Sequence, residues 1–285
     1  MKDLNAINER RKKCLLLFFL GIVAIIVGVL ILYIFGTPFG IVFGIAGFIS
    51  FIAGAVTYDK LRKDFKNKFI RSLIEEMFEE ARYFPNKGVS PDNVYRCNFI
   101  KKADRFHSED LILGKVGDVR FHTADLKLQE RRVRHTKNGT QVYYVTYFLG
   151  RFFEFDFPKE FKGQVIVSEK GLFTFWTGLK KIELESVEFN KKFNTYTTDE
   201  HNAFYILTPH FMQSLIELEK RHPGSISISF TGNTFNLAIN NSKNSFELNL
   251  FKRLNDEIVT EFKRDLAVIV DIVNELKLNR NIFKY

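Results

Sequence analysis

Hydrophobic positions are concentrated near the start of the chain. Residues 14–35 contain no charged side chain, and neither do residues 39–57. At a rise of about 1.5 Å per residue these stretches would span roughly 33 and 28 Å as helices, close to the roughly 30 Å of a hydrocarbon core. Residues 36–38 leave room only for a tight turn. The pattern predicts a transmembrane helical hairpin over 14–57, with spans at 14–35 and 39–57.

The main alternative is a cleaved signal peptide followed by a buried core helix. A secretory apolar region runs about 7–15 residues and ends at a small-residue cleavage site. Residues 14–35 are longer, lack an Ala-x-Ala pattern and are followed at once by a second apolar stretch. A lipoprotein signal does not fit either, because Cys14 follows three basic residues instead of an apolar run. These features favour the hairpin.

Basic residues flank the two spans, while the turn between them is uncharged. They are Arg10, Arg11, Lys12 and Lys13 before the first span, and Lys60, Arg62, Lys63, Lys66, Lys68 and Arg71 after the second. Basic flanks stay on the cytoplasmic side. We therefore expect a protein of the cell (inner) membrane, multi-pass with two spans, whose basic N-terminus (1–13), C-terminus and soluble domain are all cytoplasmic.

The basic balance of the chain comes mostly from these flanks. The 285 residues carry 42 Lys and Arg against 33 Asp and Glu, a formal charge of +9. Up to residue 71 the difference is 11 − 4 = +7, which leaves about +2 for everything after it. The high charge therefore reports membrane orientation, and we expect no nucleic-acid partner.

The spans themselves offer no transport chemistry. They contain no ionisable residue of the kind that pumps use, and two helices cannot enclose a pore. Small residues recur at a spacing of four: Ala24 and Gly28 on the first helix, Gly40 and Gly44 on the second. Such faces either join copies of the chain into a homo-oligomer or pack the two helices of one hairpin together, and we favour the second. The hairpin is interpreted as an anchor.

Residues 58–84 are predicted to form a juxtamembrane amphipathic helix, with apolar columns at a spacing of four and a basic first half. Five cations there are candidates for contact with anionic lipid headgroups: Lys60, Arg62, Lys63, Lys66 and Lys68. The alternative is a helix that continues from the second span and docks on the soluble domain. Pro85 ends the element.

Beyond residue 85 the pattern is one of alternation, which indicates short antiparallel strands. Asn138-Gly139 predicts a hairpin turn, and strands are expected at 141–148, 152–157, 164–167, 225–230, 235–239 and 246–250. Helices are expected from Thr198 and Thr208, and a long amphipathic helix from Asn255 or Asp256. The prediction is an α+β fold: an N-terminal two-helix transmembrane hairpin followed by a largely antiparallel β-rich soluble domain at 85–285 with a long C-terminal helix. Residues 85–285 form either one domain or two subdomains split near 188.

The sequence shows little recognisable chemistry. There is no P-loop, nucleotide-binding glycine motif, nucleophile elbow or zinc-protease motif. His107-Ser-Glu109 resembles the deaminase His-x-Glu, but its Cys partners are missing, and we expect no metal and no cofactor. The densest titratable group is Asp199, Glu200 and His201, a weak catalytic candidate that a helix start explains equally well. A basic run (Arg131, Arg132, Arg134, His135 and Lys137) either contacts phosphate or, as we favour, keeps an exposed hairpin from pairing edge to edge.

The order of features resembles a bacterial membrane-protein family catalogued as domain of unknown function three-one-three-seven. The resemblance rests on Tyr83-Phe84-Pro85, residues 109–114, residues 148–167 with the turn at 161–163, and residues 189–215 with Thr198-Asp199 and Tyr205-Ile-Leu-Thr-Pro209. It implies a bacterial source and an anchored soluble domain. It brings no activity, substrate or catalytic residue.

We therefore expect a membrane-anchored protein that presents a cytosolic domain for binding, with the lipid bilayer and an unidentified protein as partners and no identifiable catalysis. The rivals are a membrane-tethered enzyme that uses residues 199–201, and an accessory subunit of a larger membrane complex. A solvent-open helix start at 199–201 would argue against the enzyme. An exposed Gly40/Gly44 face would favour the subunit.

Overall fold

The computed structural model describes residues 2–137, 139–170, 178–276 and 278. The chain divides into two compact units, Met1–Leu73 with Phe246–Lys263, and Ile74–Ser245 with Arg264–Tyr285. We call the first the anchor unit and the second the sheet unit. The long helix α8 (Asp256–Glu275) begins in the anchor unit and ends in the sheet unit.

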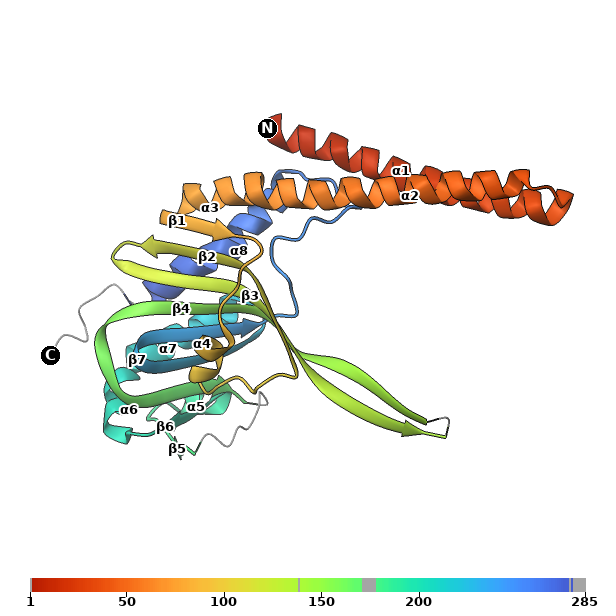
Figure 1. The fold of residues 1–285 in the computed structure, drawn as a ribbon. Helices are drawn as coiled ribbons and strands as arrows, with labels where there is room; N and C mark the ends of the chain where they lie inside the picture. The colour runs from red at the N-terminus through yellow and green to blue at the C-terminus, as the bar shows by residue number, and fades with distance from the viewer. Residues whose placement is uncertain (1, 138, 171–177, 277, 279–285) are drawn as a thin grey trace. The chain divides into compact units, whose positions relative to one another are not determined.

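The anchor unit is built on two antiparallel helices, α1 (Lys2–Phe35) and α2 (Phe39–Asp64), which lie side by side (Figure 1). Gly36, with φ +63, closes the turn between them. α1 begins before its apolar stretch and α2 ends after its own, so the charged flanks at 2–13 and 58–64 are also helical. A short π-helix, η1 (Phe65–Ile70), and α3 (Arg71–Met77) follow α2.

The helix expected to reach residue 84 ends earlier, and that part of the prediction is wrong. Strand β1 (Glu79–Phe84) follows α3 and pairs antiparallel with β2 (Arg105–Val116). The apolar columns at a spacing of four stop at Phe78, after which Ala81 and Tyr83 alternate with polar residues. Six residues are too few to reveal a period of two beside a run of helix-favouring glutamates.

The sheet unit holds an antiparallel sheet whose described strands number seven, in the order β1-β2-β3-β4-β6-β5, with β7 also paired to β4. The remaining strands are β3 (Val119–Thr136), β4 (Gly139–Glu169), β5 (Lys180–Ile182), β6 (Phe193–Thr197) and β7 (Ser225–Asn240). With its helices the chain is α+β, which confirms the predicted fold class.

Two strands are longer than the sequence suggests. β4 covers three of the expected strands, and its ladder with β7 shifts register on both sides of Phe161. β7 covers both expected strands at 225–230 and 235–239 and runs through the residues between them without reversing. Polar and glycine residues that resemble turns therefore mark irregularities within continuous strands. The strand expected at 246–250 is also wrong, because that stretch is irregular backbone of the anchor unit.

Short helices cover both faces of the sheet. α4 (Pro91–Arg96) contributes to a core cluster with Ala124, Phe152 and Ala238 on one face. On the other face Phe211 of α7 (Pro209–Arg221) packs on Phe230 and Phe235. The structure also has α5 (Val187–Lys192) and α6 (Glu200–Ile206).

The side-chain caps of these helices follow the sequence with one exception. Thr208 caps α7 as expected, and Asn255 caps α8. The cap of α6 is Asp199, so its prediction at Thr198 is wrong by one residue.

Candidate functional site: a basic arm on the sheet unit

Beyond the body of the sheet, β3 and β4 continue as a two-stranded arm (Figure 1). The pairs run from Gln129↔Thr146 to Thr136↔Gly139. Gln129 still pairs with Arg105 of β2, and beyond it neither strand has another partner among the described residues of the sheet. We call residues 129–146 the arm. All described residues from 131 to 143 are exposed, and Asn138, in the expected turn, lies outside the described residues.

The arm carries more cations than its own acids can pair. Its basic residues are Arg131, Arg132, Arg134, His135 and Lys137. Its one acid, Glu130, lies 2.7 Å from Lys101 Nζ and 3.7 Å from Arg132. The hydrogen bond and charge of Lys101 lower the pKa of Glu130. Within the described part of the chain, the side chains of Arg131, Arg134 and Lys137 have no recorded carboxylate partner.

Apolar and aromatic groups accompany these charges. Val133 and Val142 face each other across the ribbon and are 43% and 48% exposed. Tyr143, also exposed, stands opposite Arg132. The Arg105 guanidinium lies 3.3 Å from the ring centre of Tyr144, a cation–π contact.

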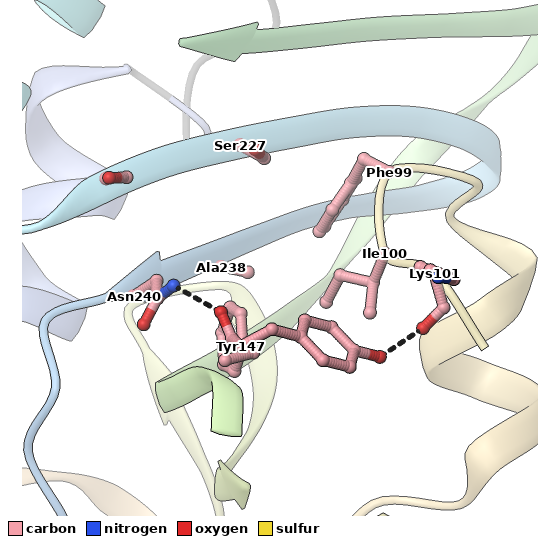
Figure 2. Close-up of a pocket in the computed structure, with 9 residues that line it drawn as sticks. Phe99, Ile100, Lys101, Tyr147, Ser227, Ala238 and Asn240 are labelled. Atoms are coloured by element: carbon pink, nitrogen blue, oxygen red, sulfur yellow. Dashed lines mark hydrogen bonds between the residues drawn. The ribbon is translucent and has the colours of Figure 1, made fainter. Parts of the chain in front are cut away.

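The root of the arm is fixed by hydrogen bonds (Figure 2). The Tyr147 hydroxyl donates to the Lys101 carbonyl at 2.6 Å. Asn240 donates to the Tyr147 carbonyl at 3.1 Å and accepts from the Leu149 amide at 3.1 Å. Burial, followed by the charges around it, raises the pKa of Tyr147, so its hydroxyl remains protonated as a donor.

A small pocket opens at this root (Figure 2). Its lining is mainly apolar and consists of Phe99, Ile100, Lys101, Tyr147, Phe148, Ser225, Ser227, Ala238 and Asn240. The empty space is about 320 Å³, but only about 20 Å³ can hold the centre of a water molecule. That is room for about one water. The pocket therefore cannot enclose a metabolite, and its lining serves to hold the arm.

A second basic surface lies across β1, β2 and β3. It is a wide groove of about 650 Å³, where Arg82, Lys115, Arg120 and His122 meet. The β1–β2 register shift between Glu79 and Arg82 lies beside it. Lys115 is paired with Glu80, whose pKa this contact lowers.

The sequence-predicted catalytic candidates are brought together only as a helix start. The Asp199 carboxylate accepts from the Asn202 amide at 3.2 Å, and Glu200 is ion-paired with Lys180. Asp199, Glu200 and His201 are all exposed. A solvent-open cap explains both acids without catalysis.

Sequence reasoning missed a buried polar cluster in the sheet. Arg151 Nε lies 2.6 Å from Asp125 Oδ1, and both side chains are at most 6% exposed. The second Asp125 oxygen accepts from the Ser245 amide at 2.6 Å. The Tyr83 hydroxyl donates to Asp110, and burial with that carboxylate raises the pKa of Tyr83. The cluster is buried and paired internally, so loss of one partner would leave an uncompensated buried charge.

The two cysteines are also buried. Cys97 lies in the core under α4, and burial raises the pKa of its thiol to about 12. Cys14 is buried between helices of the anchor unit. Neither is an exposed thiolate of the kind that catalysis needs.

In the anchor unit, most of the five proposed headgroup cations have internal partners. Glu247 lies 3.1 Å from Arg62 and 3.0 Å from Lys66, whose side chain is only 5% exposed. Lys63 is 2.7 Å from Asp59, and Lys68 is 3.8 Å from Asp64. Lys60 is exposed.

A collar, residues 246–255, explains these contacts. It runs against the bases of α1 and α2, where Asn8 exchanges two hydrogen bonds with the Leu254 backbone at 2.8 and 3.0 Å. Arg11 donates to the Leu250 carbonyl and Tyr58 to the Leu248 carbonyl. No local sequence pattern pairs residues this far apart, so the collar could not be predicted from the sequence.

Of the small residues proposed to pack helices, Gly28 and Gly40 meet across the α1–α2 pair. A Cβ on Gly28 would lie 2.6 Å from the Gly40 carbonyl oxygen, whereas a Cβ on Gly44 would meet nothing within 4 Å. Ala24 is half-buried. Gly21 and Gly47 form a second close approach, which the spacing of four overlooked. The signal is a spacing of seven, with buried Cys14, Gly21 and Gly28 on one helix and Gly40, Gly47, Gly54 and Leu61 on the other.

Comparison with known proteins bears on the second half of the chain. Residues 146–278 match the model of a family described as "Protein of unknown function (DUF3137)". The matched stretch is 133 residues long, less than half of the chain. It takes in the body of β4 and the elements up to α8, whereas the helix pair, β1–β3 and most of the arm precede it. The resembling stretches at residues 83–85 and 109–114 lie outside the match.

Other comparisons add little to the DUF3137 assignment. The curated proteins give no match. A crystal structure of the mycobacterial trehalose monomycolate transport factor A, TtfA, is similar at 10% identity and a TM-score of 0.38, covering 75% of this chain and 95% of that one. A likeness of this degree carries no functional argument.

Proposed function

We propose that the protein is a membrane-anchored, non-catalytic protein that presents its sheet unit to the cytosol for binding. The observation that carries the proposal is how α1 and α2 pack: small residues face the partner helix and large apolar residues face outward. Their closest contacts are made by glycines, with the ring pair Phe18–Phe51 beside them, while most of their large apolar side chains point outward. Exposed examples are Phe19, Val29, Phe39, Phe48 and Val56.

Such a surface fits a bilayer. Both helices are long and apolar enough to cross one, and only 11% and 17% of the residues in their most apolar stretches are buried. Soluble proteins rarely leave a contiguous apolar patch of this kind in water. Close packing through small residues is typical of helices in lipid, where large side chains gain nothing by leaving the apolar solvent.

The pairing of the helices also argues against a cleaved leader. Gly21 and Gly28 of α1 approach the backbone of α2 at Gly47 and Gly40. Removal of α1 would expose the glycines of α2 that face it, Gly40, Gly47 and Gly54. The basic flanks of both helices support a cytosolic sheet unit, because such flanks are retained on the cytoplasmic side.

The two rivals have weaker support. The membrane-tethered enzyme depends on Asp199, Glu200 and His201, and the first two already serve as helix cap and ion-pair partner. The accessory subunit depends on a free Gly40/Gly44 face. Gly40 is used within the hairpin, and only the Gly44 side is open.

Membrane orientation provides the test. Thr37→Cys places a thiol in the turn between the helices, and Lys181→Cys places one on the exposed surface of the sheet unit. With a membrane-impermeant maleimide, we expect Thr37→Cys to be labelled in intact cells and Lys181→Cys only after permeabilisation. The native cysteines are buried and give the background.

The reverse labelling pattern would contradict the cytosolic placement. A chain that stays in solution without detergent after alkaline extraction would contradict the anchor itself.

A further inference from the structure

We propose that the arm binds anionic phospholipid headgroups at the surface of the membrane that holds the anchor. The inference deepens the proposed function and rests on it. Besides the anchor, it names a second contact with lipid. This contact is made by residues 129–146, whereas the sequence had suggested the juxtamembrane cations for it.

The arm projects well clear of the body of the sheet. From Glu130 to Thr136 the ribbon continues for six residue steps beyond the last pair of β2 and β3. At about 3.4 Å per residue it projects about 20 Å. Its root is held by Tyr147 and Asn240, so the projecting part begins from a fixed base.

Charge distinguishes the arm from the segment that the sequence favoured. Below the spans, Arg62 and Lys66 are neutralised by Glu247, and Lys63 and Lys68 lie beside aspartates. On the arm, Arg132 shares Glu130 with Lys101. The Asp104 carboxylate accepts from the Arg131 backbone amide at 2.7 Å. Among the described residues, the side chains of Arg131, Arg134 and Lys137 form no ion pair with a carboxylate. Each cation near an anionic leaflet is attracted by the surface potential.

The uncharged side chains of the arm fit the same surface. Aromatic and apolar groups settle at the boundary between headgroups and acyl chains, while Lys and Arg stay among the phosphates. The exposed Val133–Val142 pair and Tyr143 supply the first kind of group next to the second. Protection against edge pairing explains the charges, but it does not call for exposed valines.

The arrangement favours a surface over a specific site on another macromolecule. Because neighbouring residues of a strand point to opposite sides, Arg131 lies on one face of the ribbon and Arg132 and Arg134 on the other. These cations line neither the root pocket nor the β1–β3 groove. Tethering to the anchor also keeps the arm at a high effective concentration near lipid.

The experiment places a fluorophore on the arm of the full-length protein. Gln141→Cys is exposed, and the native cysteines are buried, so an environment-sensitive dye marks residue 141. The protein is reconstituted into vesicles of phosphatidylcholine, alone or mixed with phosphatidylglycerol, with and without doxyl-lipid quenchers. We expect a blue shift and quenching in the anionic vesicles, both lost at high salt and absent in phosphatidylcholine.

A matched pair of variants tests the cations. The arm variant changes Arg131, Arg132, Arg134 and Lys137 to Gln, and the control changes the exposed Lys102, Lys170, Lys181 and Lys191 to Gln. Both lose the same formal charge. Each cation near an anionic surface is worth about a fivefold factor, so the arm variant should lose lipid engagement by several hundred-fold at most. The control should respond like the parent protein.

Three results would overturn the proposal: no dye response in anionic vesicles, an equal response in the arm variant, or a response only to an added acidic protein or nucleic acid. A second variant, with residues 131–144 replaced by Asn-Gly, covers misfolding and carries the dye on Thr146→Cys, at an exposed position. If its sheet signal in circular dichroism is native, the salt-sensitive dye response to anionic vesicles must also be lost.

Failure of the anchor is a separate outcome. A protein that leaves the vesicles at high salt contradicts the anchor, yet salt-sensitive flotation with anionic vesicles, lost in the arm variant, still supports the arm.

Discussion

Phenylalanine occupies opposite positions in the apolar stretches of α1 and α2 and in the core of the sheet unit. In those stretches Phe19, Phe35 and Phe39 are 65–71% exposed, whereas in the sheet unit Phe152, Phe155 and Phe230 are fully buried. The two helices approach each other most closely at glycines, whereas α7 packs on the sheet through aromatic rings. The same side chain is therefore placed outside or inside according to the solvent that the unit fits.

Charge follows the same division. The apolar stretches of α1 and α2 contain no charged side chain, while the sheet core encloses the Asp125–Arg151 pair. A buried pair persists in a soluble core because its partners satisfy each other. The helix pair thus leaves its apolar groups outside, whereas the sheet unit buries them, and substitutions can test this contrast.

The largest expected effect comes from removing a buried ring of the sheet unit. Phe230 packs at centroid distances of 4.9 Å from both Phe161 and Phe235. Phe230→Ala should destabilise the sheet unit by about 3–5 kcal/mol through lost burial and the cavity left behind. In thermal unfolding followed by circular dichroism in detergent, that is a fall of about 10 °C in Tm.

Phe19→Ala is the matched control. Its ring faces outward, so we expect a change in stability below about 0.5 kcal/mol in the same detergent. Equal losses in the two variants would mean that the helix pair is packed like a soluble core, and the contrast would be wrong.

Much of the fold follows from local patterns, and the misses have physical causes. The two apolar stretches, α7 with Thr208 as its cap and α8 with Asn255 as its cap each depend on neighbours in sequence. The continuous course of β4 and β7 does not, because a strand that bends at a bulge looks like two strands and a turn. The collar joins Asn8 to Leu254, and no local rule links residues so distant.

The sites divide in the same way. The basic run of the arm could be named from the sequence, but its isolation depends on which strands pair beyond Leu128 and Phe148. The internal partners of Arg62 and Lys66 come from Glu247, far away in the chain, so their assignment to headgroups could not be judged beforehand. The glycine stripe was visible only at a spacing of seven.

A smaller effect is expected from one methyl group between the helices. Gly28→Ala would bring its Cβ within 2.6 Å of a backbone oxygen, so the helices must separate. The cost should be about 1–3 kcal/mol. We would measure it by titrating the full-length protein with a denaturing detergent and following the proximity of dyes at the two helix ends.

Gly44→Ala provides the control because its Cβ would meet no atom within 4 Å in the hairpin. It should leave the helix pair unchanged. A loss for Gly44→Ala that matches the loss for Gly28→Ala would indicate a partner on the Gly44 side, and the accessory-subunit rival would gain.

The smallest effect concerns Glu169, a half-buried carboxylate at the margin of the sheet core. Burial raises the pKa of Glu169 above its ordinary value of 4.5, although its carboxylate accepts from the Ile226 amide at 2.7 Å. A raised pKa means that the folded state holds the proton more tightly than the unfolded state. Stability should therefore fall as pH rises from about 4.5 through the raised pKa, and stay level above it.

Glu169→Gln keeps an acceptor oxygen and removes the charge. It should raise stability by less than about 1 kcal/mol at neutral pH and leave it unchanged near pH 4, where the glutamate is protonated. Glu183→Gln, at an exposed position of the same unit, makes the same charge change and should do neither. Unfolding curves of the three proteins at both pH values decide the point. If Glu169→Gln raised stability equally at low and neutral pH, the pKa of Glu169 would not be raised. The margin of the sheet core would then tolerate a carboxylate as readily as the surface does.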